Sequence, residues 1–325
     1  MVRQGVRVIL VIKKKKTQSN QTKNPPKNDI GTLIQPKLDR ITLLMDPPNE
    51  QEKSQIISAA FNYLPSLEGF TNTSKKNGYK FSGKLKLEAS KSQPLLQLIA
   101  QDRSKPFFRL EMNPAKLGQS GLIELHSTLI SIMDGGLNYL KIHGRISRLD
   151  IAIDLLEDEF GITMNDFQFL PVEGLTRRDF SVKGDMETVY LGHPKGNQWR
   201  IYRKDKEQQK KKRKIPPTIR IERVLKNPNL KFVDLPALEN PFSTSRILAL
   251  IPSAPPNEKI WQWLIFQDCV KVRGITGALQ LLPASRRKIY RGYLNKWNAD
   301  WWNPNDIWAH WPSVLAQLAI LELGS

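Results

Sequence analysis

The chain has 325 residues, of which 40% are hydrophobic, and this is enough for two or three domains with cores of their own. A single cysteine, Cys269, excludes a disulfide framework and a cysteine-rich zinc site within one chain, and we expect this residue to lie in a helical core. The N-terminal apolar run of about seven residues precedes lysines, so it is too short to span a bilayer and is unlike a secretory signal. We therefore expect a soluble, cytoplasmic protein in a reducing compartment.

The formal net charge of +19 is concentrated in three segments. Residues 1–40 contain ten Lys or Arg and two acidic residues, residues 200–226 contain twelve and three, and residues 267–300 contain seven and two. These segments carry +8, +9 and +5, so the remainder has a net charge of −3. Clustered positive charge is typical of surfaces that contact the phosphates of nucleic acid, and it predicts such a partner.

In chain order, the first expected segment is a flexible tail over residues 1–37, which is basic and rich in Asn, Gln and Lys. A helix is expected at 50–64, where Ile56, Ala60 and Leu64 have helical spacing. A second helix is expected at 116–134, with Gly135 and Gly136 after it. Alternating or short apolar runs predict strands at 39–46, 80–90, 95–101 and 107–112.

The pattern then repeats, with strands predicted at 147–155, 188–192, 198–204 and 218–225. The segments FFRLEM (107–112) and TIRIER (218–223) share an Arg-x-Glu core, which suggests two related strand-rich halves. We therefore expect an α+β fold in which one domain, residues 38–234, is built on an antiparallel sheet.

Residues 235–257 are rich in proline and serine, which favours a linker to a small all-helical domain over 258–325. One of its helices follows Pro283 and resembles the second helix of a helix-turn-helix, although it can equally dock its tyrosines on the body. The tryptophans near the C-terminus are expected to fill a helical core. The basic side chains of this helix are Arg286, Arg287, Lys288 and Arg291.

Polar side chains share a face on three of the predicted strands, because residues two apart in a strand point to the same side. The opposite faces are apolar, so these strands should form a rigid platform. The polar sets are Arg148, Asp150 and Asp154; then Arg200, Tyr202 and Lys204; then Arg220 and Glu222.

These residue types predict phosphodiester chemistry, provided that the three strands are neighbours. Asp150, Asp154 and Glu222 are the candidate ligands of a hard cation such as Mg²⁺ or Mn²⁺. A tyrosine between two cations, as Tyr202 is, can have its phenolate stabilised and a phosphate held beside it. Each set alone is more often a solvated sheet face or simple packing, and the combination carries the prediction.

The order RLDIAIDL, YLGHPKGNQWRIYRKDKEQ, TIRIERVL resembles the Rep_trans family of plasmid rolling-circle replication initiators, over about residues 140–226. The resemblance implies that Tyr202 is the nucleophile, that it forms a 5′-phosphotyrosyl link and that it frees a 3′-hydroxyl. It places the acidic metal ligands on Asp150 and Glu222, with Asp154 a further candidate. Arg200 and Lys204 fall on basic positions that handle the phosphate.

The sequence departs from the family pattern at Arg203 and in a lysine-rich insert at 210–214, which we expect to contact the DNA backbone. The His-hydrophobic-His metal motif of the wider HUH endonucleases is absent. His143 and His193 are nearest to the site in sequence, and they are expected to cap or pack loops. The residues expected to bind DNA are Arg148, Arg203, Arg220, Lys210, Lys211, Lys212, Arg213, Arg286, Arg287, Lys288 and Arg291.

The function that this pattern predicts is metal-dependent nicking and strand transfer at a plasmid origin, in duplex and single-stranded DNA. A host helicase and a polymerase are the implied partners, and a homodimer is left open. Two alternatives use the same residues differently. One is a non-enzymatic origin-binding initiator or repressor, and the other is a tyrosine relaxase or transposase of a mobile element.

Overall fold

The computed structural model describes residues 34–322, except 69, 72–77, 103, 165–166, 171–176, 183–184, 250–253, 295–298 and 300. Most of the predicted tail over 1–37 therefore lies outside the described residues. Within the described part, Ile34 is already buried and Lys37 begins the first strand.

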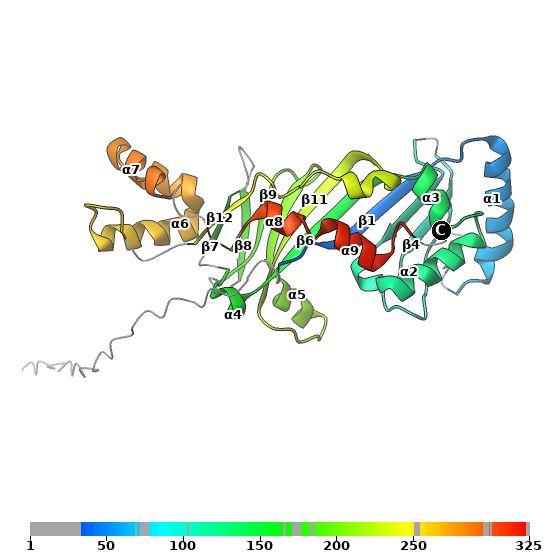
Figure 1. Ribbon diagram of the computed structural model, residues 1–325, viewed down its shortest axis with the longest axis horizontal. Helices are drawn as coiled ribbons and strands as arrows, with labels where there is room; N and C mark the ends of the chain where they lie inside the picture. The colour runs from blue at the N-terminus through cyan, green and yellow to red at the C-terminus, as the bar shows by residue number, and fades with distance from the viewer. Residues whose placement is uncertain are drawn as a thin grey trace, which may run out of the picture.

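The body is a sheet in which ten described strands pair antiparallel throughout (Figure 1). This confirms the predicted α+β fold. From one edge to the other the order is β2 (Phe70–Thr71), β3 (Tyr79–Lys84), β4 (Leu95–Ala100), β5 (Phe108–Met112), β1 (Lys37–Met45), β6 (Arg145–Leu156), β11 (Thr218–Lys231), β10 (Gln198–Arg203), β9 (Asp185–Leu191) and β8 (Arg177–Val182).

The sheet consists of two halves that meet between β1 and β6. Outward from β1 come β5, β4, β3 and β2, and outward from β6 come β11, β10, β9 and β8, so both halves place their strands in the same order. The Arg-x-Glu segments lie on the corresponding strands β5 and β11. In the register of the strands, Glu111 of β5 corresponds to Glu222 of β11. Gln97 pairs with Arg109 in the first half as Tyr202 pairs with Arg220 in the second, so Gln97 stands at the position of the tyrosine.

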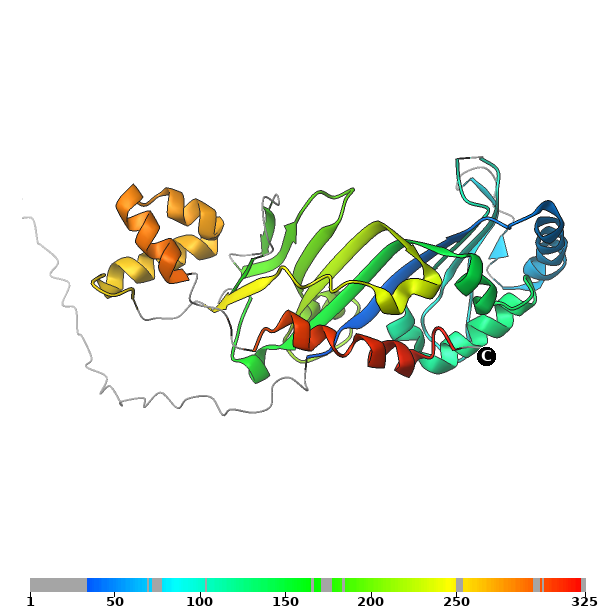
Figure 2. The same cartoon turned by 45° about the horizontal axis from the view of Figure 1, so that its top comes forward.

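Helices cover one face of this sheet, because alternate residues of the central strands are apolar. Leu149, Ile151 and Ile153 of β6 are fully buried in the core that these helices complete. The covering helices are α2 (Pro114–Ile130), α3 (Leu137–His143), η3 (Phe232–Ala237), α8 (Pro304–Trp308) and α9 (Trp311–Leu318), and Figure 2 shows α8 and α9 running across the sheet. At the far end of the first half lie α1 (Glu50–Tyr63), which Asn49 caps, and η2 (Leu64–Ser66).

The C-terminal helices divide into two groups, which corrects the single helical domain predicted over 258–325. The helices α6 (Ile260–Gln280) and α7 (Ala284–Leu294) share a core of their own with Trp263 and Tyr290. In contrast, α8 and α9 return to the body, where Trp302 and Trp311 join the main core. The expectation that the tryptophans fill a core is thus confirmed for these two, while Trp297 lies outside the described residues.

The predicted linker over 235–257 also contains regular structure. Its strand β12 (Arg246–Ala249) pairs with β7 (Phe167–Leu170) in a small second sheet. Ile247 of this strand accepts a hydrogen bond from the amide of Ala299 at 2.8 Å, so the entry to the α6–α7 unit and the exit from it lie side by side. Cys269 is half-buried against the core of this unit, as expected. No described helix is long and apolar enough to cross a membrane.

Candidate active site

The three strands with polar faces are immediate neighbours, in the order β6, β11, β10, as the chemistry predicted from the sequence requires. Arg200 lies opposite Glu222, and Tyr202 lies opposite Arg220. On the other side of β11, Arg220 lies opposite Asp154. Because paired residues in a sheet project to the same face, one polar surface spans all three strands.

Tyr202 and Glu222 are hydrogen-bonded across β10 and β11. The phenolic hydroxyl of Tyr202 donates to Oε2 of Glu222 at 3.3 Å, and Nη1 of Arg200 donates to Oε1 of the same carboxylate at 3.2 Å. Burial, and then the negative charge of Glu222, raise the pKa of the Tyr202 phenol far above its usual value. Burial, and then the charge of Asp150, raise the pKa of Glu222. Tyr202 is therefore a neutral phenol that already faces a proton acceptor.

A pocket of about 250 Å³ opens beside this pair. It lies between the sheet and the helix α5 (Lys204–Lys210), and its lining contains four cationic and three acidic side chains. The described lining residues are Glu187, Thr188, Tyr190, Arg200, Tyr202, Arg203, Lys206, Glu207, Lys210 and Glu222. A phosphate that enters here would contact the Tyr202 hydroxyl and several cations at once.

Lys204 differs from its predicted position on the strand, because β10 ends at Arg203 and Lys204 begins α5. It still lies beside the tyrosine, with Nζ 5.5 Å from the centroid of the Tyr202 ring. The ammonium group forms an ion pair with Glu207, which also binds Lys211. Although burial opposes it, hydrogen bonding to these two lysines lowers the pKa of Glu207 to about 2. The ammonium group of Lys204 is thus near Tyr202, and its ion pair with Glu207 holds it on α5.

Asp154 and Arg220 form a buried ion pair at the centre of the polar face. Arg220 donates from Nε and Nη2 to the two carboxylate oxygens of Asp154 at 2.5 and 2.7 Å, and from Nη1 to Asp39 at 2.8 Å. Lys37 adds a third cationic bond to Asp154 at 2.8 Å. Although burial opposes it, hydrogen bonding to Arg220 lowers the pKa of Asp154 to about 2. Arg220 is therefore an internal partner of carboxylates, which corrects its predicted contact with DNA.

Asp150, like Asp154, binds an arginine: Arg148 donates two hydrogen bonds to its carboxylate at 2.8 and 2.7 Å. A second guanidinium, that of Arg40, lies 3.8 Å from Asp150. Arg148 is thus bound to a carboxylate, although 23% of its side chain remains exposed toward the polar face.

The three predicted metal ligands do not converge on one point. Each of them binds at least one cationic side chain, and no three carboxylate, His or Cys groups of the described residues gather closely enough to hold a metal ion. A divalent cation prefers several oxygen ligands around one centre. The donor set, as arranged, does not fit Mg²⁺ or Mn²⁺ without the displacement of a cation.

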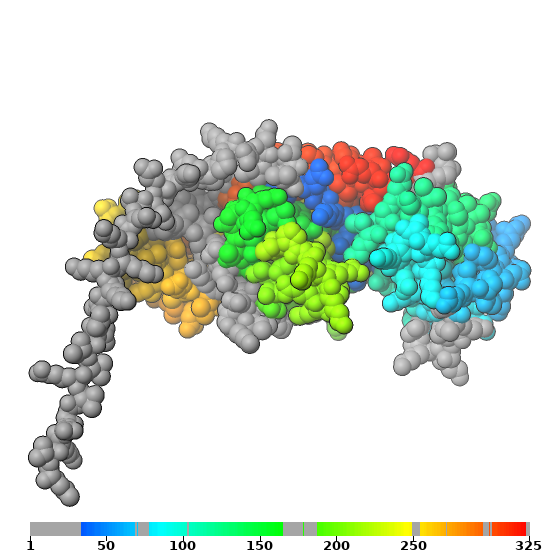
Figure 3. Space-filling model, turned by 90° about the horizontal axis from the view of Figure 1, so that it is seen from below, coloured from blue at the N-terminus to red at the C-terminus, as the bar shows by residue number. Residues whose placement is uncertain are grey.

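The lysine-rich insert forms the end of α5 and the exposed turn after it. Lys210, Lys211, Lys212 and Arg213 are all exposed, although Lys210 lies 3.7 Å from Glu187. Figure 3 shows the segment of residues 204–214, in yellow-green, projecting from this side of the molecule. Arg203, in contrast, binds both carboxylate oxygens of Asp205 at 3.0 Å and is only partly exposed. This ion pair supports the start of α5, while Arg203 still lines the pocket beside Tyr202, so its predicted DNA contact stays a prediction.

Two of the four basic residues predicted on α7 are engaged within the helical unit. Arg286 forms an ion pair with Glu258, and Arg287 donates to the carbonyl groups of Leu279, Gln280 and Leu282. Of the other two, Lys288 is exposed on α7, and Arg291 lines a pocket that is described below. The arrangement does not present the four cations together as a recognition helix would.

Sequence reasoning missed Lys37, Asp39 and Arg40, which come from β1 and complete the ion pairs of the polar face. Alternation could not have indicated both Asp39 and Arg40, because these residues are consecutive and a register shift between Leu38 and Arg40 brings both to the polar face. His193 behaves as expected: its Nδ1 accepts a hydrogen bond from the amide of Lys195 at 3.2 Å and so caps a loop.

Comparisons with known proteins give little beyond these observations. No protein-family model matches the sequence, and no curated protein matches it. Among solved structures, the chain is similar to the rolling circle replication initiator protein from Geobacillus stearothermophilus, with 16% identity and a TM-score of 0.37, over 75% of this chain and 99% of that one. At this level of similarity, no residue role is transferred from that protein. The resemblance of the sequence to the Rep_trans family stays a prediction.

Proposed function

We propose that the protein is a replication initiator that cleaves one DNA strand with Tyr202 as the nucleophile. The hydrogen bond from Tyr202 to Glu222, at the wall of a pocket that four cationic side chains help to line, is the observation that carries this proposal. The clustered positive charge and the exposed turn at 210–214 supply the surface that binds the DNA backbone.

The proposed reaction is a transesterification. Glu222 accepts the phenolic proton, and the Tyr202 oxygen attacks the phosphorus atom of the scissile phosphodiester. A new bond forms between this oxygen and phosphorus while the bond to the 3′-oxygen breaks, and the departing oxygen takes up a proton to become a 3′-hydroxyl. Because one phosphodiester replaces another, the strand can be rejoined by the reverse reaction.

Arg200 has two roles in this proposal. Its guanidinium holds the Glu222 carboxylate in place, and it lines the pocket where the phosphate would lie. Lys204 lies close enough to the Tyr202 ring to stabilise negative charge that develops on the phenol oxygen. No step is assigned to a metal ion.

The test is the formation of a covalent adduct between the protein and DNA. The protein is incubated with Mn²⁺ and a supercoiled plasmid that carries the DNA flanking its gene, and labelled DNA that remains attached after denaturation is measured. We expect adduct and nicked circles with the parent protein, none with Tyr202→Phe, and normal adduct with Tyr63→Phe, a partly buried tyrosine of α1. DNA binding without adduct in the parent protein would instead favour a non-enzymatic initiator or repressor.

A further inference from the structure

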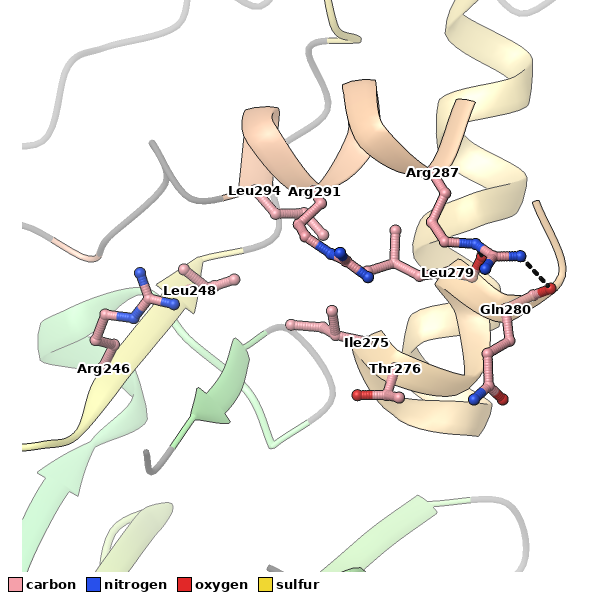
Figure 4. A pocket seen from close by; sticks show the side chains of 9 residues that line it. All are labelled: Arg246, Leu248, Ile275, Thr276, Leu279, Gln280, Arg287, Arg291 and Leu294. Atoms are coloured by element: carbon pink, nitrogen blue, oxygen red, sulfur yellow. Dashed lines mark hydrogen bonds between the residues drawn. The ribbon is translucent and has the colours of Figure 1, made fainter. Parts of the chain in front are cut away.

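A second pocket, of about 320 Å³, lies between β12 and the α6–α7 pair (Figure 4). It shares none of its described lining residues with the pocket at Tyr202. Its size is at the lower end of the roughly 300–1,000 Å³ that is typical of small-ligand sites. The lining combines arginines with aliphatic side chains, which is unusual for a surface that only packs two helices against a strand.

The arginines of this pocket carry charge that the described part of the chain does not neutralise. Arg246 of β12 and Arg291 of α7 are exposed, and neither side chain makes a hydrogen bond or ion pair within the described residues. Figure 4 shows Arg246 on β12 at one end of the pocket and Arg291 on α7, with the Arg291 side chain extending toward Leu279. The third arginine, Arg287, is fixed by the three carbonyl groups at the end of α6. None of the described lining residues is acidic, so an anion would relieve the repulsion among these cations.

The rest of the lining is apolar at its base and polar at its rim. Leu248, Leu279 and Leu294 are buried, and they belong to the core of the α6–α7 unit. Thr276 and Gln280 are exposed and supply hydrogen-bonding groups. A ligand that fits both parts has a flat apolar portion and an adjoining anionic portion, and a nucleotide has this composition.

We infer that this pocket binds one unpaired nucleotide of a DNA single strand. The phosphate lies between Arg246 and Arg291, and the base packs on the leucines, with its polar edge toward Thr276 and Gln280. In a duplex the base is stacked and paired, so it cannot enter such a pocket without first leaving the helix. The inference rests on the proposed function in one respect: strand cleavage at an origin would bring single-stranded DNA to this protein.

The affinity test uses the full chain with Tyr202→Phe and a short fluorescein-labelled oligothymidylate, measured by fluorescence anisotropy. We expect Arg246→Gln with Arg291→Gln to weaken binding by about tenfold or more, since hydrogen bonds to charged groups contribute roughly 1.5–3 kcal/mol. The matched control is Arg273→Gln with Lys288→Gln, which removes the same charge from exposed positions of α6 and α7 outside the pocket lining. An equal loss in both double variants would mean general electrostatic attraction and would overturn the inference.

Three further measurements test the nucleotide itself. An abasic oligonucleotide should bind the Tyr202→Phe protein several-fold more weakly than oligothymidylate, and Thr276→Trp, which fills the exposed rim, should remove this difference. Equal affinity for the two oligonucleotides would contradict insertion of a base. Competition by free thymidine monophosphate as strong as that of the oligonucleotide would mean a site for a free nucleotide rather than a strand.

Failure of this inference and failure of the proposed function give different results. Adduct formation by a protein with Tyr202 intact, together with unchanged oligothymidylate affinity in the Arg246 and Arg291 variant, would contradict the pocket alone. Oligothymidylate binding that depends on these arginines, in a protein that forms no adduct, would contradict the cleavage alone.

Discussion

The hydroxyl of Tyr202 and the carboxylate of Glu222 meet at 3.3 Å across two neighbouring strands. The two residues are not directly opposite each other, since Tyr202 faces Arg220 and Glu222 faces Arg200 in the register of β10 and β11. The contact is therefore diagonal, and Arg200 fixes it from the other side of the carboxylate. The sheet thus holds the hydroxyl and the carboxylate of the proposed reaction on rigid backbone.

Replacement of Glu222 by glutamine should slow adduct formation by about 100-fold or more, because general base catalysis typically contributes 10²–10⁴-fold. DNA affinity should change little. The matched control is Glu111→Gln, at the corresponding position of the first half, which should retain the parent rate. A rate for Glu222→Gln within a few-fold of the parent rate would show that another group accepts the proton.

The same pair predicts a pH dependence. Glu222 accepts a proton only when it is ionised, and burial together with Asp150 raises its pKa. The rate should therefore rise with pH through this raised pKa and then level off. In Glu222→Gln the remaining rate should keep rising toward the raised pKa of Tyr202. The rate of single-turnover adduct formation is measured against pH for the parent protein and for Glu222→Gln. Identical profiles would contradict the assignment of Glu222 as the proton acceptor.

The ion pair between Asp154 and Arg220 should contribute more to the free energy of unfolding than the ion pair between Asp154 and Lys37 does. Asp154→Asn leaves a buried guanidinium short of its partner, and we expect a loss of about 3 kcal/mol in the free energy of unfolding. Lys37→Met removes a cation that is 48% exposed, and it should cost less than about 1 kcal/mol. Urea denaturation measures both, and equal effects would contradict the buried-pair assignment.

Acid should remove this contribution of Asp154. Its pKa is lowered from 3.8 to about 2, so the folded state binds the proton less readily than the unfolded chain does. The stabilisation is present above about pH 4 and is lost as the pH falls toward 2. Asp154→Asn should accordingly show a smaller loss of stability over this range, which a series of urea titrations at different pH values would reveal.

The exposed turn after α5 should bind DNA through charge alone. Lys212→Gln with Arg213→Gln should weaken binding to all sequences alike and reduce the slope of log affinity against log salt by about one to two. Lys84→Gln with Lys91→Gln removes the same charge from exposed positions of the first half. A sequence-selective loss in the turn variant would contradict a backbone contact.

The requirement for Mg²⁺ or Mn²⁺ is still a prediction from the sequence. Because Arg148 is hydrogen-bonded to Asp150 and Arg200 is hydrogen-bonded to Glu222, a divalent cation would have to compete with these guanidinium groups. We expect a high Mn²⁺ concentration for half-maximal adduct formation, and Arg148→Gln should lower it. Undiminished adduct formation in excess EDTA would remove the metal from the proposed reaction.

The sequence was sufficient to predict eight of the ten described strands of the sheet, all but β2 and β8, and the grouping of Tyr202, Glu222 and Asp154. Period-two alternation fixes which side chains share a face, and the paired Arg-x-Glu segments indicated two related halves that the strand order confirms. Alternation could not show that Lys204 would begin a helix, because one residue past a strand has no partner to hold it extended. It also gave no sign of β12, whose four residues are stabilised by β7 from a distant part of the chain.

The roles of the arginines were harder to predict than their positions. Arg220 and Arg203 lie in the expected segments, yet each binds carboxylates of the protein itself. Arg220 binds Asp154 and Asp39 of neighbouring strands, and Arg203 binds Asp205 of α5. Sequence patterns report which side a residue faces, whereas ion pairing depends on the register between strands and on long, flexible side chains. Sequence patterns also could not separate the two groups of C-terminal helices, since both groups contain tryptophans that pack in a core.

The hydrogen bond between the amide of Ala299 and the carbonyl of Ile247 brings the two ends of the α6–α7 unit together. The unit is thus an insertion in the chain of the body, since α8 and α9, which follow it, complete the main core. The contact that joins its two ends lies on β12, outside the sheet that holds Tyr202. The two proposed activities, binding of an unpaired nucleotide and cleavage by Tyr202, therefore lie on parts of the chain with separate hydrophobic cores.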